Sequence, residues 1–232
     1  MKRRLFHLGA ALLAAATAAF ALTGAATLTG TEKKAAPLIL LDAGHGGFDG
    51  GAVAADGTAE KDINLAVTLK LDAFLRAMGY DTLLIREGDV SVETEGHSVR
   101  ERKRSDIRHR YEVMEAHPGC LYLCIHQNFH TGRSSGAQIF YTAQNEDAKA
   151  LAQSLQTAIV GGLQPGNTRQ IKPCTKDVYL IYHAKQTAVL IECGFFSDPG
   201  DLRDLKDESY QRKLAFAITQ GLADYLDGRE SP

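Results

Sequence analysis

After Pro37, short apolar segments alternate with longer segments in which apolar residues recur at helical spacing. Between residues 60 and 78, Ile63, Val67 and Leu71 follow a period close to 3.6, and Gly79 stands where a left-handed residue ends many helices. Such alternation is typical of a sheet covered by helices on both faces. The sequence therefore predicts one three-layer α/β domain with a mixed, mostly parallel sheet.

This pattern predicts the individual elements as well. The expected strands are 38–42, 80–86, 120–126, 137–142, 178–182 and 188–193, and the expected helices are 60–78, 99–116, 146–160 and 210–226. Residues 87–98 are polar and non-periodic, and residues 161–177 contain two prolines and several glycines. Both segments are expected to be loops.

Residues 1–36 differ from the rest of the chain. Lys2, Arg3 and Arg4 precede an apolar run to residue 30 that carries no charged side chain except the ionisable His7. This layout predicts a signal peptide or an N-terminal signal anchor followed by a short linker, and hence an exported protein. The run approaches the roughly 20 residues that span a bilayer, so the sequence leaves both forms open.

The bulk composition excludes some classes of function. The formal net charge is −2, which gives no field to attract nucleic acid, and membrane contact is expected only through the N-terminal segment. The four cysteines lack CxxC spacing, and we expect them to be small buried side chains rather than a disulfide framework. A Cys120–Cys174 bridge is the less favoured alternative.

A glycine-rich segment, residues 42–51 (DAGHGGFDGG), follows the first predicted strand. It does not fit a dinucleotide-binding fingerprint, because Asp49 stands where the third glycine is needed and no helix follows directly. Glycines on either side of His45 instead leave bare backbone where a metal or a substrate can approach closely.

Three further polar residues stand at the ends of predicted core elements: Glu60, His126 and Glu192. A carboxylate within an apolar strand, as at Glu192, costs several kcal/mol or changes its pKa unless it is paired. A salt-bridged core glutamate and a hydrogen-bonded histidine are the structural alternatives. Two histidines and one carboxylate form a common catalytic zinc shell, and a second carboxylate would be the general base. No HExxH motif is present, so spacing alone does not decide between these interpretations.

The segments LILLDAGHGGFDGGA, EKDINLA, IHQN and AVLIECGFFS resemble the amidase-3 family of zinc-dependent N-acetylmuramoyl-L-alanine amidases. The resemblance implies an amidase-3 (phosphorylase/hydrolase-like) catalytic domain over residues 37–228. It also implies one zinc ion bound by His45, Glu60 and His126, with Glu192 as the catalytic carboxylate. The substrate would be a peptidoglycan glycan strand with its stem peptide, cleaved at the lactyl amide bond to L-alanine.

Other residues receive weaker roles from this resemblance. Asp42, Gln127, Asn128 and His183 are candidates for binding substrate or for supporting the ligands. Cys124 stands two residues before His126, where the family usually has serine. The basic run between Arg100 and Arg110 is expected to be a solvated helix face, and contact with anionic peptide carboxylates is the functional alternative.

The segments SVRERKRSDIRHR, GAQIFYT and VYLIYHAKQTAVLIECGFFSDPGDLRDLKDESYQ are similar to one subgroup, the germination-specific spore-cortex amidases. That similarity implies a role in forming muramic-δ-lactam, in the cell wall or the forespore intermembrane space, with an accessory or deacetylase partner. A general cell-separation autolysin is the alternative within the family. Another peptidoglycan zinc hydrolase and a non-catalytic wall-binding module are the alternatives outside it.

Overall fold

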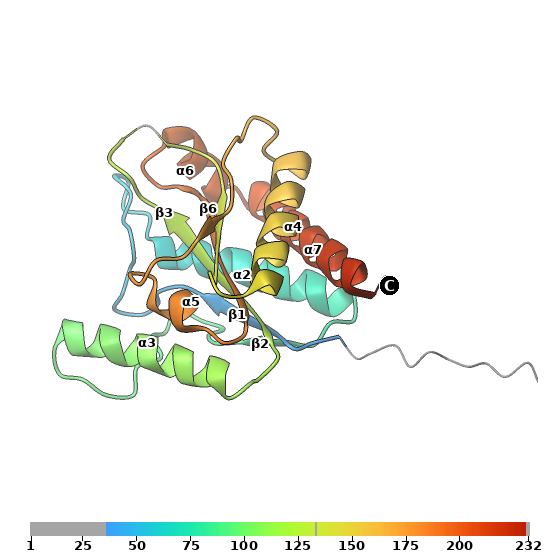
Figure 1. The fold of residues 1–232 in the computed structure, drawn as a ribbon. Coiled ribbons are helices and arrows are strands. Elements are labelled where there is room, and N and C mark those ends of the chain that lie inside the picture. Colours follow the sequence, from blue (N-terminus) through green and yellow to red (C-terminus); the bar gives the residue numbers. More distant parts are fainter. Residues whose placement is uncertain (1–35, 133, 231–232) are drawn as a thin grey trace, which may run out of the picture. The chain divides into compact units, whose positions relative to one another are not determined.

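The computed structural model describes residues 36–132 and 134–230. Residues 1–35, which hold nearly all of the expected signal segment, lie outside the described residues. In the described part, six strands form one sheet in the order β2-β1-β3-β6-β4-β5 (Figure 1). The strands are β1 (Ile39–Ala43), β2 (Thr82–Leu84), β3 (Leu121–Asn128), β4 (Gln138–Tyr141), β5 (Lys172–Pro173) and β6 (Thr187–Phe195).

The sheet is mixed and mostly parallel, as the sequence predicts. β1 pairs in parallel with β2 and β3, β3 with β6, and β4 with β5, whereas β4 runs antiparallel to β6. The central strands β1, β3 and β6 are almost continuously buried. That burial explains their uninterrupted apolar sequences, because a strand covered on both faces has no solvent side to make polar.

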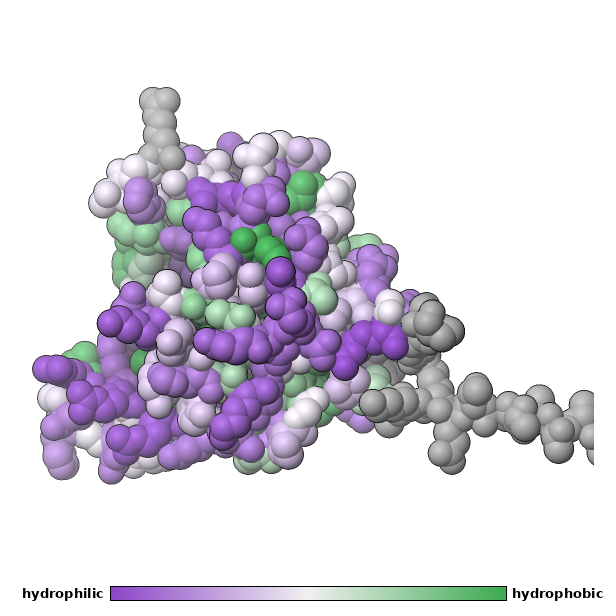
Figure 2. Space-filling model, viewed as in Figure 1, coloured by the Kyte–Doolittle hydropathy of each residue, from purple (hydrophilic) through white to green (hydrophobic). Residues whose placement is uncertain are grey.

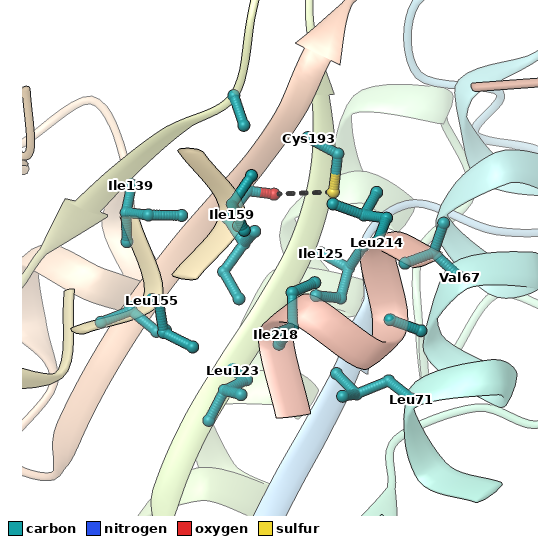
Figure 3. Close-up of a cluster of buried hydrophobic side chains, with 14 of the residues drawn as sticks. Val67, Leu71, Leu123, Ile125, Ile139, Leu155, Ile159, Cys193, Leu214 and Ile218 are labelled. Atoms are coloured by element: carbon teal, nitrogen blue, oxygen red, sulfur yellow. Dashed lines mark hydrogen bonds between the residues drawn. The ribbon is translucent and has the colours of Figure 1, made fainter. Parts of the chain in front are cut away.

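Helices α2 (Glu60–Ala77), α4 (Glu146–Gly162) and α7 (Glu208–Glu230) cover one face of the sheet. Figure 3 shows how their apolar side chains meet those of the sheet: Leu71 of α2 and Ile218 of α7 lie near Leu123 of β3. The largest of these side chains are fully buried. Burial of one such side chain stabilises the fold by about 1.5–3 kcal/mol, which holds the helix layer on the sheet.

Helix α3 (Val99–Glu115) and the short helix α5 (Tyr179–His183) lie on the opposite face. Met114 and Ile181 pack there with Tyr122 and Leu190 of the sheet in a second apolar cluster. Figure 1 shows α3 apart from α4 and α7, with the sheet between them. The predicted three-layer architecture is therefore confirmed.

The helix starts follow local hydrogen bonding. The Ser98 side chain accepts from the Glu101 backbone N–H, and the Glu101 carboxylate accepts from the Ser98 backbone N–H, which forms a capping box at the start of α3. Helix α6 (Pro199–Lys206) begins with Asp198 accepting from two backbone N–H groups and with Pro199 at its first position. The Asp198-Pro199 pair that starts this helix can be recognised in the sequence, yet α6 was not among the predicted helices.

Two other predictions differ from the structure. Residues 178–182, expected to be a strand, form the helix α5 instead, because a five-residue apolar run is too short for its period to distinguish the two. Ile181 is buried while Tyr179 is 46% exposed, so this turn packs one side on the sheet. The expected loop 161–177 contains the two-residue strand β5 at the sheet edge.

The four cysteines are free and buried, as the composition suggests. Among the helices of residues 36–132 and 134–230, none combines the length and the apolar character that a membrane crossing needs.

Candidate metal centre and active site

Three core elements bring His45, Glu60 and His126 together at the carboxyl end of the sheet. His45 follows β1, Glu60 is the first residue of α2, and His126 lies late in β3. One potential ligand atom from each of the three residues lies within 4.8 Å of the others. The carboxyl edge of an α/β sheet is where such sites commonly form, and the structure places these residues there.

The Glu60 carboxylate lies at the centre of the cluster. One oxygen is 3.2 Å from His45 Nε2 and the other is 2.9 Å from His126 Nδ1. The backbone N–H groups of Ala52 and Gln127 also donate to it, at 2.9 and 3.0 Å. Burial alone would raise the pKa of Glu60, but the hydrogen bonds and charges of the two histidines outweigh burial and hold this pKa well below its usual range. Glu60 is therefore ionised, and a metal cation could take the place of the histidine protons that now balance its charge.

His45 is held from both sides. Its Nδ1 lies 3.0 Å from Asp49 Oδ2, and Lys103 Nζ lies 2.8 Å from the other Asp49 oxygen. Burial would lower the pKa of His45, but Asp49 and Glu60 raise it to about 9. Since a metal ligand must be the neutral imidazole, binding of a cation at this cluster would release the His45 proton.

The backbone around His45 is shaped for close approach. His45 itself has φ of 61°, a left-handed conformation that is uncommon outside glycine. A Cβ on Gly44 would lie 2.0 Å from His126 Nε2, and a Cβ on Gly51 would lie 2.5 Å from a Glu60 oxygen. These glycines are therefore required by the packing of the potential ligands against bare backbone.

Two buried arginines, which the sequence analysis did not identify as site residues, fix the segment that carries His45. Arg110 of α3 pairs with Asp42 and with Asp106, and it donates to the backbone carbonyls of Ala43 and His45 at 3.1 and 2.8 Å. The Asp42 pair raises the pKa of Arg110 even though burial opposes this. The expectation that the whole run to Arg110 is a solvated face is wrong for Arg110, which is 2% exposed.

The second arginine, Arg86, follows β2. It donates to the carbonyls of Ala43 and Gly44 at 2.8 and 3.1 Å, and also to the carbonyl of Lys61 at 2.8 Å. Burial is the main cause that lowers the pKa of Arg86, and the nearby positive charge of Arg110 lowers this pKa further. The Arg86 guanidinium group therefore connects the loop after β1 to the first turn of α2 through hydrogen bonds. The apolar strand before Arg86 gave no sign of this contact.

Glu192 lies beside the cluster in a pocket of about 300 Å³. Its strand register places it opposite His126 of β3. Among the described residues, Glu192 Oε2 is one of four buried side-chain nitrogen or oxygen atoms without a hydrogen-bond partner. Burial raises the pKa of Glu192 to about 7, the negative charge of Glu60 adds to this, and His126 and His45 oppose it. A carboxyl group with such a pKa can both take and give a proton near neutral pH.

The other residues named from the resemblance lie in different places. Asp42 is fully buried and accepts from the hydroxyl of Tyr122 as well as from Arg110. Gln127 lies on the α2 face, where its side chain donates to Asn64 Oδ1 at 3.1 Å. Asn64 in turn donates to Glu60 at 3.3 Å, so Gln127 supports Glu60 through its backbone and through Asn64.

Asn128 and His183 are outside the lining of the pocket that holds Glu192. Asn128 ends β3, and its carbonyl accepts from the Phe196 N–H at 2.8 Å. His183 is exposed at the end of α5, with its ring 4.5 Å from that of Tyr179. Cys124 does line the pocket, and its thiol lies 3.7 Å from Asp42 Oδ2.

The donor set suits a zinc ion. Two imidazoles and a carboxylate are a frequent catalytic combination for zinc, which binds nitrogen and oxygen ligands in an open tetrahedral shell. The histidines share Glu60 between them, and Glu192 lines the same pocket as both histidines. These residues therefore fit a metal centre with an adjacent proton-transfer group.

Comparisons with known proteins identify relatives of the whole domain. The germination-specific N-acetylmuramoyl-L-alanine amidase of Bacillus subtilis (strain 168) is 32% identical over 197 residues, which cover 84% of this chain and 82% of that protein. The structure of the CwlD amidase from Clostridioides difficile in complex with the GerS lipoprotein is similar, with a TM-score of 0.80 and 37% identity. That match covers 83% of this chain and 100% of the CwlD chain.

A third relative is the N-acetylmuramoyl-L-alanine amidase LytC of Bacillus subtilis (strain 168), which is 30% identical over 81% of this chain but only 35% of LytC. The family of N-acetylmuramoyl-L-alanine amidases, Amidase_3, matches residues 39–224. These residues include the whole sheet and all four polar residues of the site. The chain therefore belongs to the Amidase_3 family of N-acetylmuramoyl-L-alanine amidases.

Proposed function

We propose that this amidase is zinc-dependent and that it hydrolyses the amide bond between the lactyl group of N-acetylmuramic acid and L-alanine of the stem peptide. The observation that carries this proposal is the meeting of His45, Glu60 and His126 beside Glu192, which pairs in register with His126 and lines the same pocket. His45, Glu60 and His126 would hold the ion. When bound, zinc would supply Lewis-acid polarisation of the scissile carbonyl and of the attacking water.

The protein's own groups would carry the protons. Glu192 takes a proton from the water whose oxygen forms the new bond to the lactyl carbonyl carbon. It then gives that proton to the L-alanine nitrogen as the carbon–nitrogen bond breaks. The products are a lactyl carboxylic acid and a peptide with a free amine. Arg110 and Arg86 hold the carbonyls of residues 43–45 in place and so keep His45 in position.

The direct test is Glu192→Gln, which keeps the shape of the side chain but cannot accept the proton. We expect the rate on muropeptides to fall by about 10²–10⁴-fold, with zinc content unchanged by atomic absorption. Glu208→Gln on the exposed start of α7 is the matched control. Mass spectrometry of the products should show peptide-free glycan with intact N-acetyl groups. Near-normal activity of Glu192→Gln would contradict this assignment, and release of acetate or of a terminal amino acid would point to another hydrolase.

We further propose a role in maturation of the spore cortex, through formation of muramic-δ-lactam. Support comes from the two relatives described as a germination-specific amidase and as CwlD, each matched over most of its length. On this proposal the enzyme acts outside the cytoplasm. A lipoprotein partner such as the one in the CwlD complex, or a deacetylase acting on the same glycan, would accompany it.

The cortex role can be separated from that of a general autolysin, which the similarity to LytC keeps as the alternative. Deletion of the gene should leave a cortex without muramic-δ-lactam while vegetative cells separate normally. Chains of unseparated cells with a normal cortex would favour the autolysin instead.

A further inference from the structure

The exposed face of helix α3 carries a row of four cations, of which only Lys103 is linked to the catalytic cluster. Arg100, Lys103, Arg104, Ile107 and Arg108 are spaced three, four, seven and eight residues from the first, so they share one face of the helix. With Tyr179 of α5 they line a groove of about 490 Å³. Figure 2 shows mostly hydrophilic residues over this part of the molecule, along the lower edge of the view.

This groove adjoins the pocket of Glu192. Lys103, Ile107 and Tyr179 line both. Lys103 also connects the two through its ion pair with Asp49, which holds His45. A substrate whose scissile bond lies at Glu192 would therefore reach the groove across these three shared residues.

Among the described residues, two of the four cations make no ion pair, although Arg104 lies close enough to Glu101 for their charges to interact. Lys103 pairs with Asp49 at 2.8 Å and Arg108 pairs with Glu95 at 3.0 Å. In the part of the chain that the structure describes, Arg100 and Arg104 have no acidic side chain within ion-pair distance, and Glu101 between them is engaged in the capping box. Both arginines are exposed. The groove therefore offers two guanidinium groups that can bind anions, beside the apolar surfaces of Ile107 and Tyr179.

Charge decides which part of the substrate suits this groove. The glycan side of the scissile amide carries neutral hydroxyl and N-acetyl groups, whereas the stem peptide carries free carboxylates beyond its first alanine. Guanidinium groups bind carboxylates through two parallel hydrogen bonds. We propose that the α3 groove is the stem-peptide subsite, in which Arg100 and Arg104 bind the carboxylates that follow L-alanine. This proposal rests on the proposed amide cleavage and adds a preference for unamidated stems.

The test compares Arg100→Glu/Arg104→Glu with wild type on two substrates, a muropeptide with free stem carboxylates and the same compound with those carboxylates amidated. Exposed ion pairs change affinity by up to about fivefold each, so we expect KM for the free-carboxylate substrate to rise about tenfold at low salt. We expect kcat, and KM for the amidated substrate, to change less than twofold. Salt of about 0.5 M should reduce the difference through screening. Arg100→Lys/Arg104→Lys should recover most of the affinity.

The matched control is Arg212→Glu/Lys213→Glu, which reverses two exposed charges on α7 across the sheet and should leave both KM values unchanged. Calorimetric binding of the free tripeptide product, with and without amidation, gives a readout that needs no catalysis. An unchanged KM for the carboxylated substrate, or an equal rise for both substrates, would overturn the subsite. Failure of the proposed function would give a different result, because the wild-type enzyme would then release no peptide with a free L-alanine amine. Calorimetric binding of the tripeptide would still test the groove in that case.

Discussion

Removal of the Arg110 guanidinium by Arg110→Met should be among the most destabilising changes in this protein. The Arg110 side chain is 3% exposed and its partner Asp42 is 0% exposed. Removing one partner of a buried ion pair costs about 3–5 kcal/mol, because the remaining charge has neither water nor a counter-ion. The hydrogen bonds to the carbonyls of Ala43 and His45 are lost as well. Asp42 keeps the hydroxyl of Tyr122 as a donor, so we expect a loss near the lower end, about 3 kcal/mol.

Urea unfolding followed by circular dichroism measures this loss as a change in the free energy of unfolding. For a domain of this size, each kcal/mol lowers Tm by about 2–4 °C, so thermal unfolding should begin about 6–12 °C earlier. Arg212→Met on the surface of α7, whose Glu208 pair is exposed, is the control and should cost less than about 0.5 kcal/mol.

A double-mutant cycle with Asp42→Asn isolates the pair itself. If the buried charge of Asp42 is the cause, Arg110→Met should cost much less in the Asp42→Asn background, with a coupling of about 2 kcal/mol. Additive effects, or a loss below about 1 kcal/mol for Arg110→Met alone, would refute the reasoning.

Three other predictions concern the metal centre and the thiols. Gly44→Ala would place a methyl group 2.0 Å from His126 Nε2, so zinc affinity measured by chelator competition should fall at least about tenfold. Gly161→Ala, with no atom near its Cβ, should bind zinc normally, and equal affinities would contradict the packing argument. Zinc at about 100 times its Kd should stabilise metal-free protein by about 2.7 kcal/mol, which is measured as an increase in Tm. Glu60→Gln should abolish this increase. If the increase persists in Glu60→Gln, the ion binds elsewhere. Burial raises the pKa of Cys120 to about 11 and of Cys174 to about 12, so the folded state keeps thiol protons that the unfolded chain loses above about pH 8.5. Stability should therefore fall as pH rises beyond that value, and a thiol reagent at pH 8 should label these residues only on unfolding; rapid labelling of native protein would contradict their burial.

The sequence predicts the fold well where a pattern is long. Helix α2 ends within one residue of its expected boundary, and the apolar runs of β1, β3 and β6 lie at the centre of the sheet. Prediction failed where segments are short. Five apolar residues at 178–182 suit a strand or a turn of helix equally, and only packing against the sheet decides between them.

The candidate site divides in the same way. Four site residues could be identified from the sequence: His45, Glu60, His126 and Glu192. They are polar residues at the ends of apolar elements, and their segments resemble a known family. The supporting residues were not legible. Arg110 looks like any other cation of a basic helix, and its burial against Asp42 depends on a contact between residues 68 positions apart. Arg86 follows a strand whose neighbour, β1, is likewise distant in sequence.

The position of β6 has a consequence for the order of folding. This strand lies between β3 and β4, although it is the last strand in the chain. β4 and β5 can therefore join the rest of the sheet only after residues 187–195 have been inserted between β3 and β4. The three potential zinc ligands come from residues 45–126, whereas Glu192, the proposed proton carrier, arrives on the inserted strand. A chain that is still being made, or one shortened before residue 187, holds the potential ligands but lacks the proposed general base, so hydrolysis should begin only once the sheet is closed.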